Sequence, residues 1–115
     1  GADSSAEELG WRLENIVFQK LHAGRKSGGY ELYYWKNGHE IDFLLVRGKK
    51  VIKLIQASYS IKNEKTKARE VSALISGAER FKCDDLEIIT FSERNELESG
   101  SHHIKVTPIS EWLIA

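Results

Sequence analysis

The hydrophobic pattern of the chain changes its period near Tyr30, and this change limits the class of fold. Before Tyr30, apolar residues recur at helical spacing and predict a helix over residues 6–23. After Tyr30 the period becomes two, which predicts strands over residues 30–36, 39–47 and 51–58. Asn37-Gly38 between the first two strands is typical of a hairpin turn. The pattern therefore predicts a helix followed by an antiparallel meander.

The second half of the chain alternates between the two periods. An apolar face predicts a helix over residues 63–80, with Asn63 as its N-cap. Residues 86–91 are mainly apolar and predict a strand buried on both faces. Residues 92–101 form a predicted charged loop, residues 102–107 a last strand and residues 110–114 a terminal helical turn, while residues 25–29 form a predicted glycine-rich loop. The order α-β-β-β-α-β-β predicts an α/β fold with a mixed sheet flanked by helices.

Composition excludes several classes of protein. The 115 residues carry 17 basic and 17 acidic side chains, so the basic excess of most nucleic-acid-binding domains is absent. No apolar run is long enough for a membrane span, and the start does not resemble a signal peptide. The lone Cys83 cannot form an internal disulfide, which favours a reducing cytoplasm. A nucleic-acid function would therefore need a local basic patch.

The length suits a single domain, which we expect over residues 9–115. Residues 1–8 are expected to be a disordered or artificial extension. The chain contains no Met, not even at its start. We therefore expect it to be a fragment of a longer protein.

A carboxylate interrupts the apolar face of the first predicted helix. At about 100° per residue, Glu14 falls between Leu21 and Phe18 on the helical wheel. A carboxylate within an apolar face costs several kcal/mol unless it has a partner or is neutralised. Either the helix is rotated so that Glu14 lies at the rim, or Glu14 points at a polar site on the sheet.

Two further polar residues interrupt apolar strands, namely Asp42 and Gln56. Their relative position depends on the turn between the strands, because a slip of one residue reverses the face of every side chain. A three-residue loop of Gly48, Lys49 and Lys50 pairs Leu44 with Leu54 and sets Asp42 opposite Gln56, whereas a two-residue turn separates them. We predict the three-residue loop, because it gathers the polar residues in one patch.

Glu14, Asp42 and Gln56 would then converge from a helix and two neighbouring strands. Two carboxylates and an amide oxygen suit Mg²⁺, which prefers oxygen ligands and can activate water near a phosphate. The alternative is a buried hydrogen-bonded network that holds no ion.

Basic and aromatic residues suggest other contacts. Four cations lie near the start of the second long helix and form a candidate nucleic-acid contact, although most such runs are solvated surfaces: Lys62, Lys65, Lys67 and Arg69. Tyr33, Tyr34 and Trp35 could stack on bases, but aromatic strands usually fill cores, and we predict the core. Trp11 and Trp112 are expected to be packing residues or contacts with a further domain.

Several segments resemble one protein family in the same order along the chain. They are Leu13–Phe18, Glu31–Lys36, Glu40–Leu44, Ile55–Ser60, Thr66–Glu70 and Ile104–Leu113. Together they resemble the DUF4143 family, the C-terminal domain of a large group of prokaryotic AAA-type ATPases. The resemblance covers nearly everything from Leu9 onward. It implies an upstream ATPase domain as a partner in the same chain and ATP binding there, and no GxxxxGK[ST] loop occurs in this chain.

That family is in turn similar to the PD-(D/E)xK nuclease, or restriction-endonuclease-like, fold. The resemblance implies that Glu14 matches the acid of the first helix, Asp42 the aspartate of the second strand and Gln56 the acid or amide of the third. Ser58 stands at the position of the motif lysine. A serine cannot carry the positive charge that helps to orient the attacking water. The resemblance therefore leaves catalysis open.

Two functions follow from these observations. One is an accessory module of an AAA-type ATPase that binds DNA or a protein through a degenerate nuclease-like site. The other is a Mg²⁺-dependent DNA endonuclease or phosphodiesterase that uses Glu14, Asp42 and Gln56. The serine at position 58 favours the module. The sequence leaves the substrate and the oligomeric state open.

Overall fold

The computed structural model describes residues 2–115, and the side chains from Ser5 onward. The elements are α1 (Ala2–Ala23), α2 (Arg25–Gly28), β1 (Glu31–Asn37), β2 (His39–Arg47), β3 (Lys50–Ala57), α3 (Glu64–Phe81), β4 (Leu86–Thr90), β5 (Asn95–Ser99), β6 (His102–Pro108) and α4 (Ile109–Ile114). The predicted elements are present, with two additions, α2 and β5.

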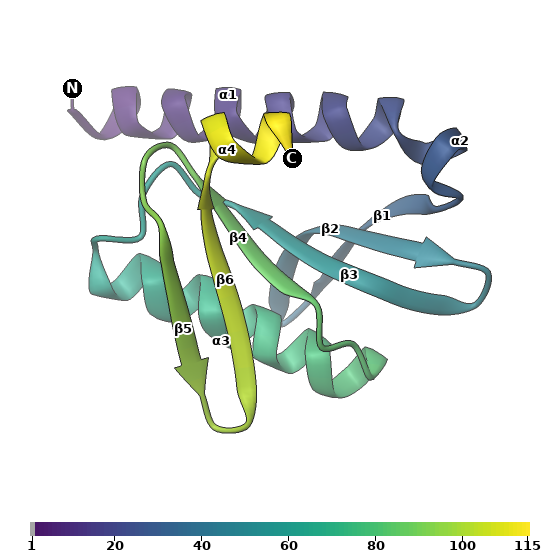
Figure 1. The fold of residues 1–115 in the computed structure, drawn as a ribbon. Coiled ribbons are helices and arrows are strands. Elements are labelled where there is room, and N and C mark those ends of the chain that lie inside the picture. Colours follow the sequence, from purple (N-terminus) through teal and green to yellow (C-terminus); the bar gives the residue numbers. More distant parts are fainter. Residues whose placement is uncertain (1) are drawn as a thin grey trace.

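The strands form one mixed sheet in the order β1-β2-β3-β4-β6-β5. The meander β1-β2-β3 is antiparallel, β4 and β6 continue the sheet in parallel, and β5 pairs antiparallel with β6. Helix α3 connects β3 to β4 across one face of the sheet, and α1 with α4 lies on the other face (Figure 1). The α/β class with a mixed sheet and flanking helices is confirmed.

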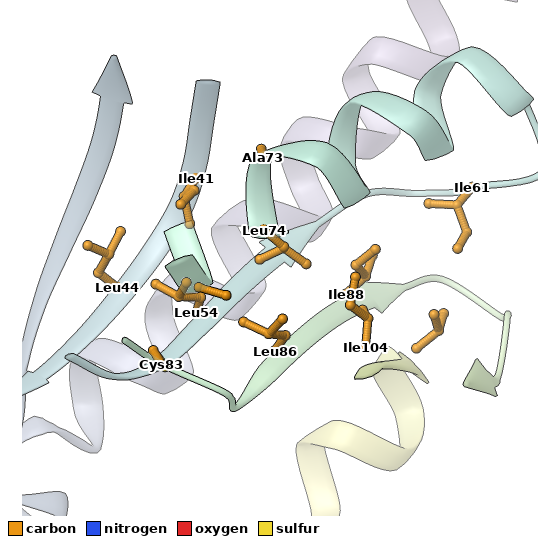
Figure 2. Packing of buried hydrophobic residues seen from close by; sticks show 12 residues of the cluster. Ile41, Leu44, Leu54, Ile61, Ala73, Leu74, Cys83, Leu86, Ile88 and Ile104 are labelled. Carbon is orange, nitrogen blue, oxygen red and sulfur yellow. The ribbon is translucent and has the colours of Figure 1, made fainter. Parts of the chain in front are cut away.

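Each face of the sheet has its own core. On the α3 face, Leu54 and Ile88 pack against Leu74 and Ala78 (Figure 2). On the α1 face, Val17 and Leu21 pack on Ile55 and Ile89, together with Trp112 from α4. β4 is buried along its whole length because it contributes to both cores. Among residues 2–115, no helix is both long and apolar enough to span a membrane.

Helix α3 begins and ends where the local chemistry requires. The Asn63 side chain accepts a hydrogen bond from the backbone N–H of Thr66 at 3.0 Å, as an N-cap does. At the other end Lys82 adopts a left-handed conformation, with φ of 56°. The predicted bounds of this helix are correct to one residue.

Three segments differ from the predicted elements. α1 begins at Ala2 and not at Ala6. Residues 25–28 form the short helix α2 instead of a loop, with a backbone hydrogen bond of 2.8 Å from Gly28 to Gly24. The predicted charged loop contains β5, whose acidic residues face solvent while Leu97 packs on the core. Such charged edge strands escape a search for apolar runs.

The first hairpin reverses in a different way from the predicted Asn37-Gly38 turn. Asn37 already pairs with His39, so the reversal is centred on Gly38, which has a positive φ of 77°. Further from the turn, Tyr33 pairs with Leu44. This pairing is possible because β2 has one more residue than β1 between the turn and this pair. The extra residue forms a β-bulge, in which two residues of β2 oppose one residue of β1.

The predicted three-residue loop between β2 and β3 was also wrong. Arg47 pairs with Lys50, so the turn holds two residues, and Val46 pairs with Val51. A bulge at Ile52 then adds one residue to β3. This bulge supplies the extra residue that we had assigned to the loop, and it shifts the register in the same way.

As a result, the pairing of Leu44 with Leu54, which sets the position of Asp42 relative to Gln56, was predicted correctly. Leu44 pairs with Leu54 and Phe43 with Ile55, so that Asp42 and Gln56 face each other one step further along. The turn and the bulge compensate, and the polar residues of the two strands meet.

Candidate functional site

The site begins where β2 and β3 separate. The bulge in β2 sets Asp42 and Phe43 opposite the single residue Tyr34. Regular pairing with β3 ends at Phe43, and side chains then take the place of the backbone ladder. The two strands are thus held together at this end by Asp42 and Gln56.

The side chains of Asp42 and Gln56 each form hydrogen bonds with the backbone of the opposite strand. The Gln56 Oε1 accepts from the Asp42 backbone N–H at 2.8 Å, and the Gln56 Nε2 donates to the Glu40 carbonyl at 2.9 Å. The Asp42 Oδ2 accepts from the Ala57 backbone N–H at 2.8 Å. Gln56 is only 1% exposed, so both ends of its amide are buried and satisfied. Each bond replaces one that a continuous sheet would make.

An acidic cavity opens beside this pair. It measures about 440 Å³ and is lined by Glu14 of α1, by Glu40 and Asp42 of β2, and by Arg69 and Glu70 of α3. The structure therefore brings Glu14 and Asp42 together, as the wheel and the register predicted. Glu14 is half-buried, between the two positions that the sequence left open.

Asp42, Glu14 and Glu70, three of the residues around the acidic cavity, hold their protons more strongly than in water. The pKa of Asp42 is raised from 3.8 to about 7, chiefly by burial and also by the nearby charges of Glu14, Glu70 and Glu40, while the Ala57 N–H opposes the shift. Burial, then the charge of Glu40, raises the pKa of Glu14. Burial also raises the pKa of Glu70, against the lowering effect of Arg69. The cavity therefore disfavours the accumulation of further negative charge.

Two of the predicted Mg²⁺ ligands are engaged by backbone groups in this arrangement. Among the side chains that the structure describes, from Ser5 onward, no three carboxylate, imidazole or thiol groups lie close enough together to hold a metal ion. Gln56 could offer its oxygen to an ion only by releasing the buried Asp42 N–H, and one Asp42 oxygen is bound to Ala57. Losing such a buried bond costs about 1–3 kcal/mol.

The position of the motif lysine carries no basic group. The Ser58 hydroxyl donates to the Ser60 carbonyl at 3.0 Å, and Ser58 does not line the acidic cavity. The Lys53 ammonium group is bound to Asp85 at 3.2 Å and to the buried Glu87 at 3.1 Å. Arg69 and His39 are basic residues that line the cavity, and the Arg69 guanidinium lies 3.5 Å from Glu70.

The predicted nucleic-acid residues do not form one patch. Lys65 and Arg69 are four residues apart and share a face of α3, whereas Lys67 lies about 160–200° around the helix from both. Arg25 and Lys26, which could have extended the patch, lie in α2 at the end of α1, on the other side of the sheet from α3 (Figure 1). The cations are therefore spread over separate surfaces.

Sequence reasoning missed an aromatic groove between α1 and the β1–β2 hairpin. The groove has a volume of about 400 Å³, and aromatic side chains dominate its walls: Trp11, Phe18, Tyr33, Tyr34 and Phe43. Our prediction of a core position was wrong for Tyr33 and Tyr34, which are 51% and 54% exposed, because β1 is an edge strand that α1 does not cover. Trp11 is 68% exposed and Trp112 is buried.

The acidic cavity and the aromatic groove share two residues. Glu14 and Asp42 line both, so their carboxyl groups stand between a polar and an apolar surface. Glu40 and Glu70 were also missed as cavity residues. The signal for Glu70 was its spacing, since it precedes Ala73 by three residues and Leu74 by four on the buried face of α3.

The fold and the site together define an α/β domain with a six-stranded mixed sheet and a carboxylate-lined cavity at the splayed end of β2 and β3. The model of the domain of unknown function DUF4143 matches residues 9–112. The chain therefore belongs to the DUF4143 family. No curated protein and no solved structure matches it.

Proposed function

We propose that this chain is a non-catalytic protein-binding module built on a degenerate PD-(D/E)xK-like core, and that it serves as the C-terminal accessory domain of an AAA-type ATPase. One observation supports the loss of catalysis: the Gln56 side-chain oxygen and one of the two Asp42 carboxylate oxygens already accept hydrogen bonds from backbone N–H groups. The resemblance supplies the expectation of an upstream ATPase domain as partner.

The position of Ser58 supports the same conclusion. PD-(D/E)xK-type cleavage needs a cation near the attacking water, and the Ser58 hydroxyl is instead bound to the chain itself. Arg69 lines the acidic cavity, but a guanidinium stays protonated and cannot act as a general base. We infer that the groups around the cavity position a ligand and that the nuclease chemistry has been lost.

A protein partner is favoured over DNA by the character of the exposed surface. The aromatic groove carries Trp11, Phe18, Tyr33 and Tyr34 beside the carboxylates of Glu14 and Asp42. Exposed aromatic side chains are typical of the centre of protein interfaces. Carboxylates at the rim repel phosphate, and the net charge of zero provides no compensating attraction.

A second candidate, a Mg²⁺-dependent DNA nuclease that uses Glu14, Asp42 and Gln56, is favoured by one observation. Burial is the main cause of the raised pKa values of Glu14, Asp42 and Glu70, and the charges of neighbouring carboxylates add to it; a divalent cation would relieve this second contribution. Binding of an ion would require Gln56 to turn away from the Asp42 N–H.

The two candidates are separated by a cleavage assay and a thermal melt. We expect no cleavage of plasmid or branched DNA with millimolar Mg²⁺ or Mn²⁺, and no rise in the melting temperature with either ion. Cleavage that disappears in Asp42→Ala would establish the nuclease and remove the non-catalytic module. Asp84→Asn, which changes an exposed aspartate outside the acidic cavity, is the matched control.

A further inference from the structure

Helix α1 carries a second stripe of residues besides the one that it buries. Leu13, Val17 and Leu21 face the sheet and are buried. About a third of a turn around the helix, Trp11 and Phe18 face the aromatic groove at a spacing of seven residues. Asn15 and His22 lie on the same stripe and also line the groove. Spacings of three, four and seven residues are those by which one helix packs against another.

The stripe changes its charge from one end to the other. Glu7 and Glu14 lie in its first half, and Glu14 lines the groove. His22 and Arg25 line the groove at the other end. Arg12, the cation in the first half of α1, is already paired with Glu8 at 2.7 Å. The stripe is therefore acidic at one end, aromatic in the middle and basic at the other end.

The charges of such a stripe are complementary to those of a second copy of the stripe that runs in the opposite direction. If a second α1 lies antiparallel across a two-fold axis near residue 16, Glu7 of each copy approaches the far end of the other copy's α1, where Arg25 begins α2. The same axis sets Glu14 opposite Phe18 and Trp11 close to His22, which lies one residue beyond the position directly opposite Trp11. A closed interface of this kind uses the same surface on both subunits, as in most homodimers.

We propose that the aromatic groove is a homodimer interface, in which a second copy of this chain lays its α1 antiparallel against the first. This proposal rests on the proposed function, since it names the protein that the groove binds. A uniformly basic partner would meet His22 and Arg25, and a uniformly acidic one would meet Glu14 and Asp42. Only a partner with charges of both signs, in reverse order, matches the groove, and α1 is such a partner.

The first test is the mass of the chain in solution by sedimentation equilibrium over a concentration series. We expect a dimer for the wild type and a monomer for Phe18→Asp, which places a charge in the middle of the stripe. Ile16→Asp is the control, because Ile16 is 44% exposed and Phe18 43%, yet Ile16 does not line the groove. It should stay dimeric. A circular dichroism melt of each variant checks that it is folded.

The second test is a charge swap that depends on the antiparallel arrangement. Glu7→Arg and Arg25→Glu each create a like-charge contact across the interface, and each should raise the dimer dissociation constant about tenfold. The double variant carries opposite charges again at both ends and should return to within about threefold of the wild type. Added salt should weaken the wild-type dimer.

Three results would overturn the homodimer. The first is a wild-type chain that stays monomeric at every concentration, and the second is a Phe18→Asp variant that stays dimeric. The third is a double charge-swap variant whose dimer dissociation constant is no lower than those of the single variants. These failures are distinct from failure of the proposed function. A monomeric chain that cleaves no DNA remains a non-catalytic module, whereas metal-dependent cleavage removes that function whatever the oligomeric state.

Discussion

Replacing Asp42 by Asn tests whether the buried carboxyl group of Asp42 destabilises the folded chain as the pH rises. Burial and the neighbouring carboxylates raise the pKa of Asp42 from 3.8 to about 7. Between these values the folded chain keeps the proton that the unfolded chain has lost. The free energy of unfolding therefore falls as the pH rises through this window, and the loss is complete above about pH 7.

The size of the effect follows from the shift. At about 1.4 kcal/mol for each pH unit, the interval from 3.8 to about 7 corresponds to at most about 4 kcal/mol. Asp42 borders two open cavities, where solvent screens part of this energy. We therefore expect Asp42→Asn to be about 2 kcal/mol more stable than the wild type at about pH 8. The Asn side chain oxygen can still accept from the Ala57 N–H, so the hydrogen bond at 2.8 Å is kept.

The assay is urea denaturation of both proteins at a series of pH values from about 4 to about 8. The difference between the two curves should grow with pH across the window and vanish near its acid end. Asp84→Asn, the same chemical change at an exposed position, should show no such growth. A difference that is constant with pH, or a variant that is less stable than the wild type at about pH 8, would refute the reasoning.

Three further substitutions test the structure around the site, each by urea denaturation. Gln56→Ala removes two buried hydrogen bonds and should cost about 2–4 kcal/mol, whereas a cost below about 0.5 kcal/mol would mean that the amide does not hold β2 to β3. Lys53→Met leaves the buried Glu87 carboxylate without its cation and should cost about 3 kcal/mol, and an unchanged stability would contradict the ion pair. Gly77→Ala should cost about 1–3 kcal/mol, because a Cβ there would lie 2.5 Å from a methyl group of the core. Gly10→Ala is the control for this change: a Cβ at Gly10 would have no atom within 4 Å, so the substitution should stabilise α1. Equal changes in stability for the two variants would refute the packing argument.

The residues of the site could be predicted because each one breaks a strong local pattern. Asp42 and Gln56 interrupt apolar strands, and Glu14 interrupts an apolar helical face. Such interruptions are visible in one sequence, since burying a polar group is costly and demands a partner. Glu70 was missed because it stands in a charged run, in which only its spacing from Ala73 and Leu74 distinguishes this half-buried carboxylate from its neighbours.

The sequence predicted the final register between β2 and β3, but not the turn and the bulge that produce it. The β2–β3 turn is one residue shorter than we expected, and the bulge at Ile52 restores the missing residue. A bulge is stabilised by its surroundings and leaves no clear mark in the sequence. The exposure of Tyr33 and Tyr34 was unpredictable for a similar reason, because it depends on where α1 crosses the sheet. That position is fixed by the long-range packing of Val17 and Leu21.

The extra residue in β2 connects the two surfaces of the domain. In a regular strand Asp42 and Phe43 would point to opposite faces, yet both line the aromatic groove. The bulge thus turns Asp42 toward α1, places its Oδ2 against the Ala57 N–H and leaves Gln56 to bind the freed backbone. The same backbone geometry therefore engages the Gln56 side-chain oxygen and one Asp42 oxygen, and it shapes the floor of the groove. The proposed binding surface and the proposed loss of metal chemistry would both follow from this one bulge.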